Sequence, residues 1–167
     1  MSEAVRSSEG RAWDALARAA AAAEQAGESV VLEELVVFCV NGETYAVPVS
    51  RVREIVRLRP ITPVPRVPAE VLGVISLRGE IAQVIDLRMR LGGAAAEPTR
   101  TTRIIVLHGD EGDVTGLMVD TVDQVYRVPA DELTPPSSSD SVFVEALCTR
   151  GDAFISVLQL EKVLAID

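Results

Sequence analysis

The sequence predicts an all-β fold, a sandwich or barrel made of two similar subdomains in tandem and preceded by a helical extension. Three observations support this prediction. After residue 30 the chain consists of short β-rich apolar runs separated by turn signals, with no long helical stretch between them. Part of this pattern recurs later in the chain. Residues 1–29, by contrast, are rich in alanine.

The alanine-rich extension, residues 1–29, predicts a helix. Nine of the fifteen residues from Ala12 to Ala26 are alanine. Ser8 is a suitable N-cap, and Gly27 is a suitable residue to end the helix. An isolated helix of this length is marginal in water. The extension therefore attaches loosely, or docks through Trp13 on the body, on a second copy or on a partner.

The body of the chain predicts nine strands. Asn41-Gly42 favours a tight hairpin between the first two, and the prolines of residues 60–68 indicate an extended crossover after a short polar segment at Ser50–Glu54. A linker rich in Gly and Ala then places the junction of the subdomains near residues 90–102. The expected strands are Val30–Val40, Glu43–Val49, Val71–Leu77, Glu80–Ile85, Arg103–Leu107, Val114–Val119, Val122–Val128, Phe143–Cys148 and Ala153–Leu158.

An internal repeat supports two similar subdomains. At an offset of 70 residues the coinciding pairs are Val47/Leu117, Val49/Val119, Val52/Val122, Ile55/Val125 and Arg57/Arg127. At an offset of 72 residues, Arg78-Gly-Glu coincides with Arg150-Gly-Asp. Chance similarity between apolar strands could produce the first match, but the order of the elements repeats as well. Two like modules would create a groove where they meet.

The composition excludes several classes of partner. The 167 residues include 16 basic and 25 acidic side chains, for a net charge of −9. Nucleic acids and anionic membrane surfaces both attract clustered Lys and Arg, which this chain lacks. Its apolar runs are shorter than the ~20 residues of a membrane helix, and no secretory signal is present. We expect a soluble cytoplasmic protein that binds no nucleic acid and inserts in no membrane.

The search for catalytic or metal-binding residues finds no convincing site. Nucleophilic hydrolysis needs a base beside Ser or Cys, and the single histidine, His108, stands in a predicted exposed turn. Cys39 and Cys148 lie in apolar runs and read as small buried hydrophobes. Asp86, Asp120 and Asp123 stand near strand ends, where carboxylates more often cap a turn. We expect a non-enzyme without cofactor or metal.

One arginine at a tight turn does suggest a binding surface. Arg78 stands between two apolar strands, and Glu54 is its expected partner. An exposed ion pair of this kind contributes only about 0.2–1 kcal/mol to folding. It is better suited to orienting a binding surface than to holding the fold together.

Five motifs, in order, resemble the CheW domain family. They are Glu43-Thr-Tyr with Val47-Pro-Val, Val52-Arg-Glu-Ile, Ile61-Thr-Pro-Val-Pro leading to Gly73-Val-Ile-Ser-Leu-Arg-Gly, Val84-Ile-Asp-Leu-Arg, and Gly116-Leu-Met-Val-Asp-Thr-Val. The resemblance covers about residues 34–166 and implies a domain over 30–167 with two intertwined SH3-like five-stranded barrels. It also implies a non-catalytic adaptor that couples chemoreceptors to a CheA-type histidine kinase.

The resemblance also implies two partners and a set of contact residues. The cytoplasmic helical hairpin tip of a chemoreceptor would bind between the subdomains, and the kinase's regulatory domain would pair with the barrel ends. Carried over by motif, the expected receptor-binding residues are Val49, Val52, Glu54, Arg78, Gly116 and Val125. Ser76 and Ala82-Gln83 depart from the family pattern, as does the extension. A variant that binds receptor but not kinase, in a specialised motility pathway, is the alternative.

Overall fold

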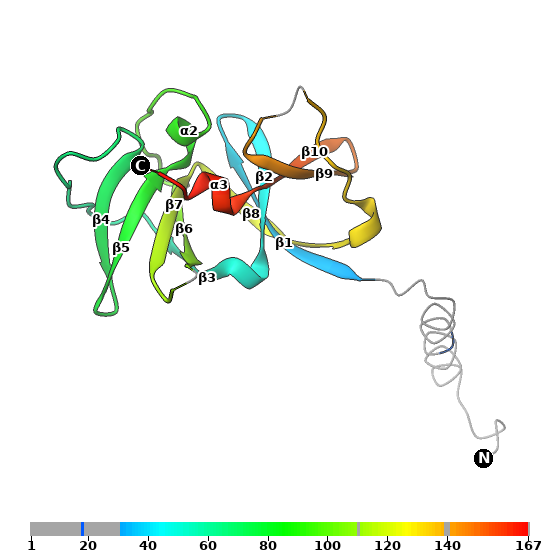
Figure 1. Ribbon diagram of the computed structural model, residues 1–167, viewed down its shortest axis with the longest axis horizontal. Helices are drawn as coiled ribbons and strands as arrows, with labels where there is room; N and C mark the ends of the chain where they lie inside the picture. The colour runs from blue at the N-terminus through cyan, green and yellow to red at the C-terminus, as the bar shows by residue number, and fades with distance from the viewer. Residues whose placement is uncertain (1–17, 19–30, 110, 139–140, 167) are drawn as a thin grey trace, which may run out of the picture.

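A computed structural model describes residues 18, 31–109, 111–138 and 141–166, and these residues form two five-stranded sheets (Figure 1). Apart from Arg18, the expected helix of residues 1–29, with its anchor Trp13, lies outside the described residues. Sheet A has the order β8 (Thr121–Pro129), β1 (Leu32–Val40), β2 (Glu43–Pro48), β10 (Ala153–Leu158) and β9 (Val144–Arg150). Sheet B has the order β3 (Val52–Arg57), β6 (Arg103–His108), β7 (Val114–Val119), β5 (Glu80–Asp86) and β4 (Val71–Leu77).

Four short helices connect or follow the strands: η2 (Val49–Arg51), α2 (Leu87–Arg90), η3 (Ala130–Glu132) and α3 (Leu160–Val163). The all-β prediction is confirmed, and each of the nine expected runs contains a strand. The tenth strand, β3, was not predicted, because Ser50–Glu54 read as a short polar segment. It lies at the edge of sheet B, with charged residues between its apolar ones.

Two hairpins turn through dipeptides that end in glycine. Asn41 (φ 54°) and Gly42 (φ 78°) connect β1 to β2. Arg78 (φ 52°) and Gly79 (φ 83°) connect β4 to β5 in the same way. Two consecutive residues with positive φ match the right-handed twist of the strands they join. The expected Asn-Gly turn is confirmed.

The repeat appears in the sheets as a one-to-one correspondence of strands. Replacing each strand of β3-β6-β7-β5-β4 by the strand five places away in the sequence gives β8-β1-β2-β10-β9. The bulges correspond too, since Arg53 and Asp123 are skipped in the pairing of β3 and β8 with their neighbours. We call β1–α2 (residues 32–90) the first repeat and β6–α3 (residues 103–163) the second repeat.

Each sheet, however, combines strands of both repeats. Sheet A contains β1 and β2 of the first repeat with β8, β9 and β10 of the second. The strands on either side of residues 90–102, β5 and β6, both belong to sheet B. The division between the sheets is distinct from the expected junction near residues 90–102, which separates the two repeats. It falls instead at η2, between β2 and β3, and at Asp120, between β7 and β8.

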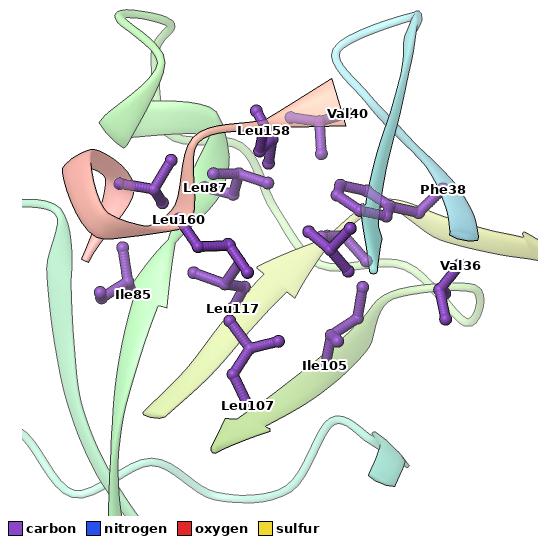
Figure 2. Close-up of a cluster of buried hydrophobic side chains, with 13 residues drawn as sticks. Val36, Phe38, Val40, Ile85, Leu87, Ile105, Leu107, Leu117, Leu158 and Leu160 are labelled. Atoms are coloured by element: carbon purple, nitrogen blue, oxygen red, sulfur yellow. The ribbon is translucent and has the colours of Figure 1, made fainter. Parts of the chain in front are cut away.

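The largest hydrophobic cluster lies between the two sheets (Figure 2). Smaller clusters fill the interior of sheet A, around Leu35 and Ile155, and of sheet B, around Ile75 and Ile104. Burial of the shared cluster fixes the two sheets against each other. Its buried members are Val36, Phe38, Val40, Val47, Ile85, Leu87, Ile105, Leu107, Leu117, Val119, Leu158, Leu160 and Val163.

Candidate partner-binding surface

Val49 and Val52 lie where the chain passes from sheet A to sheet B. Val49 begins η2 and Val52 begins β3, directly after Pro48 ends β2. Both side chains are half-buried and pack against the cluster between the sheets, as does Val122 of β8. The crossover therefore presents a short apolar margin that is continuous with the core.

Two ion pairs connect β3 to the turn between β4 and β5. Arg78 Nη2 lies 3.2 Å from Glu54 Oε1, which confirms the pairing expected from the sequence. The neighbouring residue Arg53 donates a hydrogen bond to Glu80, on the other side of the same turn. The Glu54 side chain is 19% exposed and the Arg78 side chain 75% exposed. The turn is thus held to the edge strand, with the guanidinium of Arg78 at the surface.

Gly116 does not lie at the surface. It is buried in the middle of β7, between Val106 of β6 and Val84 of β5. A Cβ atom at this position would lie 2.6 Å from the Ile104 side chain. Gly116 therefore serves the packing of sheet B, and no side chain at this position can face a partner.

Val125 is exposed, with 53% of its surface accessible, and it lies on β8 opposite Val36 of β1. Its counterpart in the first repeat is Ile55 of β3, which is 40% exposed. β3 and β8 are edge strands of their sheets, so each edge carries one exposed apolar side chain. Of the expected residues, Val49 and Val52 share one cluster and Glu54 and Arg78 share one ion pair. Val125 stands apart on the other sheet.

Two exposed apolar side chains at the hairpin tips were missed from the sequence. Ile81, next to the Arg78-Gly79 turn, is 65% exposed, and Phe154, next to the Gly151-Asp152 turn, is 74% exposed. They occupy equivalent places in the two repeats, each at the start of the second strand of its hairpin. The sequence match at an offset of 72 residues places Ala153, not Phe154, against Ile81, so the repeated turn did not reveal this pair.

The described residues offer little catalytic chemistry. They contain no group of three or more His, Cys, Asp or Glu side chains that could hold a metal ion. His108 is exposed at the end of β6. Asp86 is buried at the start of α2, where its carboxylate accepts a hydrogen bond from the Arg88 N–H. Burial raises the pKa of Asp86, although these backbone hydrogen bonds oppose the effect.

Within the part of the chain that the structure describes, no helix has the length and apolar character that crossing a membrane requires. Both cysteines are free. Cys148 is buried as expected, whereas Cys39, which was also expected to be buried, is half-buried. Its Sγ lies 3.9 Å from Thr44 Oγ1 and 3.9 Å from Asp123 Oδ2.

Comparison with known proteins agrees with this fold and surface. Residues 34–167 match the family described as the CheW-like domain. The chain belongs to this family. The chemotaxis protein CheW of Rhizobium meliloti is 40% identical over 134 residues, covering 78% of this chain and 86% of that protein. CheW of Helicobacter pylori is 29% identical over 153 residues, covering 89% and 91%.

A solved structure shares the architecture of this CheW-like domain. The scaffolding protein TtCheW of Thermoanaerobacter tengcongensis superposes with a TM-score of 0.75 at 31% identity, covering 82% of this chain and 90% of that one. The two five-stranded sheets are accordingly the two SH3-like subdomains of a CheW-type fold.

Proposed function

We propose that this CheW-like domain is a non-catalytic adaptor that couples chemoreceptors to a CheA-type histidine kinase, in the cytoplasm at receptor arrays. Family membership over residues 34–167 carries the proposal. The relatives in Rhizobium meliloti and Helicobacter pylori bear the name chemotaxis protein, and the solved neighbour is a scaffolding protein. An adaptor needs binding surfaces and no reacting group, which agrees with the side chains at the surface described above.

We assign the receptor contact to the edges of the two sheets. Val49 and Val52 supply an apolar margin that is continuous with the core, and the Glu54–Arg78 pair flanks it with charge. Ile55 and Val125 add exposed apolar side chains on β3 and β8. A helical hairpin that lays an apolar face against these edges would bury side chains that are only partly covered in the free protein.

We assign the kinase contact to the exposed apolar side chains beside the two hairpin turns, and Arg78 of the first turn stays with the receptor contact. Ile81 and Phe154 are among the most exposed large apolar side chains of the described residues, and each stands at the end of a barrel. The regulatory domain of a CheA-type kinase is itself CheW-like, as the family resemblance implies. Apolar packing between barrel ends would join the two domains.

Binding measurements with charged substitutions test both contacts. Calorimetric titration would use the full chain against the hairpin tip of a chemoreceptor and against the regulatory domain of the kinase from the same cell. V125D should weaken receptor binding at least tenfold, because a carboxylate placed in an apolar contact loses its hydration. F154D should weaken kinase binding by a similar factor. Both side chains are exposed, so the variants should fold.

V142D is the matched control, because Val142 is 68% exposed and lies outside both proposed contacts. Val52→Asp should abolish receptor binding, but Val52 also packs against the core, so its effect requires an unfolding measurement alongside. Receptor binding without kinase binding by the unsubstituted chain would contradict the coupling role. An effect of V142D equal to that of V125D would contradict the assigned surface.

A further inference from the structure

A surface hollow of about 480 Å³ lies where β3 ends and β6 begins. Seven residues line the hollow. Three of them are arginines, and none is acidic. The lining residues are Arg57, Leu58, Thr99, Arg100, Thr101, Thr102 and Arg103. Such a concentration of positive charge without a carboxylate is unexpected in a chain with 25 acidic and 16 basic side chains.

Arg57 of β3 stands directly opposite Arg103 of β6 in the strand pairing. Like charges directly opposite each other destabilise a sheet. The second repeat shows the alternative: Arg127, the counterpart of Arg57, stands opposite Glu34, and their side chains form an ion pair of 3.1 Å. The same fold thus neutralises one cross-strand arginine and leaves the other facing a second positive charge.

The three guanidinium groups keep donors available. Those of Arg57 and Arg100 form no hydrogen bond or ion pair with any residue that the structure describes. Arg103 Nη1 donates to the carbonyl oxygens of Arg100 and Thr102, both at 2.9 Å, and this fixes the direction of the side chain. Its Nε and Nη2 donate to no residue in the described part of the chain.

The loop that carries Arg100 is ordered by its own threonines. The Thr99 N–H donates to Thr102 Oγ1 at 2.8 Å, and the hydroxyls of Thr99 and Thr101 lie 2.9 Å apart. Thr101 Oγ1 also donates to the Asp120 carbonyl, at the crossover between the sheets. The floor of the hollow is therefore organised before any ligand arrives, which lowers the entropic cost of binding.

We propose that this hollow binds a phosphate group, either free or carried by a small molecule. A phosphate carries about −1.5 to −2 charge at pH 7, more than a carboxylate, and would neutralise most of the charge of the cross-strand pair. Guanidinium groups match the geometry of its oxygens through paired N–H donors. The volume exceeds that of one phosphate and falls in the range of small-molecule sites. The proposal does not depend on the adaptor role.

Titration of the full chain at constant ionic strength tests this proposal. The probes are inorganic phosphate, pyrophosphate and adenosine monophosphate, with chloride replaced so that screening stays constant. We expect saturable binding that R57Q and R100Q each weaken at least tenfold. R127Q is the matched control, because it removes the equivalent arginine of the other repeat, and it should change the Kd less than twofold. Tighter binding of adenosine monophosphate would identify a phosphorylated small molecule as the source, and equal or weaker binding would identify free phosphate.

R57E provides a second, independent readout. Glutamate opposite Arg103 gives a cross-strand pair like Glu34–Arg127 with the two charges exchanged between the strands. The variant should therefore melt at a higher temperature than the unsubstituted chain and lose phosphate binding. Phosphate should raise the melting temperature of the unsubstituted chain and of R127Q, but not that of R57E. Absence of saturable binding, or equal losses in R57Q and R127Q, would overturn the proposal.

Discussion

The first and second repeats share a backbone plan and differ in the side chains placed on it. Strand order, bulges and hairpins correspond, and the apolar tips Ile81 and Phe154 are retained. The charges are not retained, since the Glu34–Arg127 pair of one sheet corresponds to two arginines, Arg103 and Arg57, in the other. The fold therefore depends on the apolar periodicity and the turns. The charged residues, which differ between the repeats, are available for binding.

The exchange of strands explains why the two repeats hold together. Each sheet takes two strands from one repeat and three from the other, and the cluster between the sheets contains residues from both repeats. Neither repeat can complete a sheet by itself. We therefore expect the two repeats to unfold together. The effect of a substitution in one repeat can be compared with the effect of the equivalent substitution in the other.

Gly73 and Ala146 give the largest expected difference between the repeats. Gly73 has φ 141°, and a Cβ there would lie 2.1 Å from the Thr62 carbonyl oxygen, which is hydrogen-bonded to the Val74 N–H at 2.9 Å. Its counterpart Ala146 carries a Cβ within the same bulged pairing. Gly73→Ala should lower the free energy of unfolding by about 3 kcal/mol in urea titration. Ala146→Gly should lower it by at most about 1 kcal/mol. Equal losses of unfolding free energy would show that the two bulges restrict the residue at this position to the same extent.

Asp86 and Gln159 differ in how they begin the equivalent helices α2 and α3. The Asp86 carboxylate accepts from the Arg88 N–H at 3.0 Å, whereas Gln159 forms no side-chain cap. Asp86→Ala should therefore cost about 1 kcal/mol of unfolding free energy. Asp86→Asn should keep the cap, since asparagine caps as well as aspartate. Gln159→Ala is the control and should show no loss of a cap. Equal costs for Asp86→Asn and Asp86→Ala would contradict the capping role of Asp86.

The Asp86 variants should also differ in their pH dependence. Burial raises the pKa of Asp86 in the folded chain above its usual 3.8, so the folded state holds this proton more tightly than the unfolded state. The contribution of Asp86 to stability is thus greatest below pH 3.8 and declines as the pH rises through the raised pKa. Asp86→Asn should remove this decline in unfolding curves measured from pH 3 to pH 7. An unchanged decline would assign it to other groups.

The sequence was sufficient for nine of the ten strands and for the repeat, but not for which strands pair. Alternation of apolar residues identified nine strands, and the Asn41-Gly42 turn followed from its dipeptide. Intertwined subdomains were expected, but a local pattern does not show which strands are exchanged, because the same strands are buried either way. β3 was missed because Arg53, Glu54 and Arg57 made an edge strand look like a loop.

The candidate site was predictable where it depended on a pair of charges and not where it depended on register. Glu54 and Arg78 were paired correctly from a turn and a charged segment. Gly116 was expected at the receptor contact through its motif, yet it is buried, because only the structure shows which strands flank it. Arg57 and Arg127 were matched in sequence, but their different partners depend on strand register.

The ion pairs Glu54–Arg78 and Glu34–Arg127 allow a further comparison between the two sheets. Glu54–Arg78 and Glu34–Arg127 have similar separations, 3.2 and 3.1 Å, but Glu54 is 19% exposed and Glu34 is 49% exposed. A less exposed pair is less screened by water. Double-mutant cycles should give a coupling of about 0.5–1 kcal/mol for Glu54–Arg78 and less than about 0.5 kcal/mol for Glu34–Arg127. Equal couplings would show that burial of Glu54 does not strengthen its pair.

A substitution of Arg78 is expected to change the free energy of unfolding the least. It should affect stability and receptor binding in opposite directions. Its φ of 52° is left-handed, which costs a residue other than glycine about 1 kcal/mol, and the Glu54 pair, with Arg78 largely exposed, recovers at most a similar amount. Asn41, at the same place in the β1–β2 turn, is a residue that tolerates this conformation. Arg78→Asn should therefore leave the free energy of unfolding unchanged or raise it by about 0.5 kcal/mol. The same variant should weaken receptor binding several-fold, because the turn loses its positive charge. A loss of stability without a loss of binding would assign Arg78 to the fold.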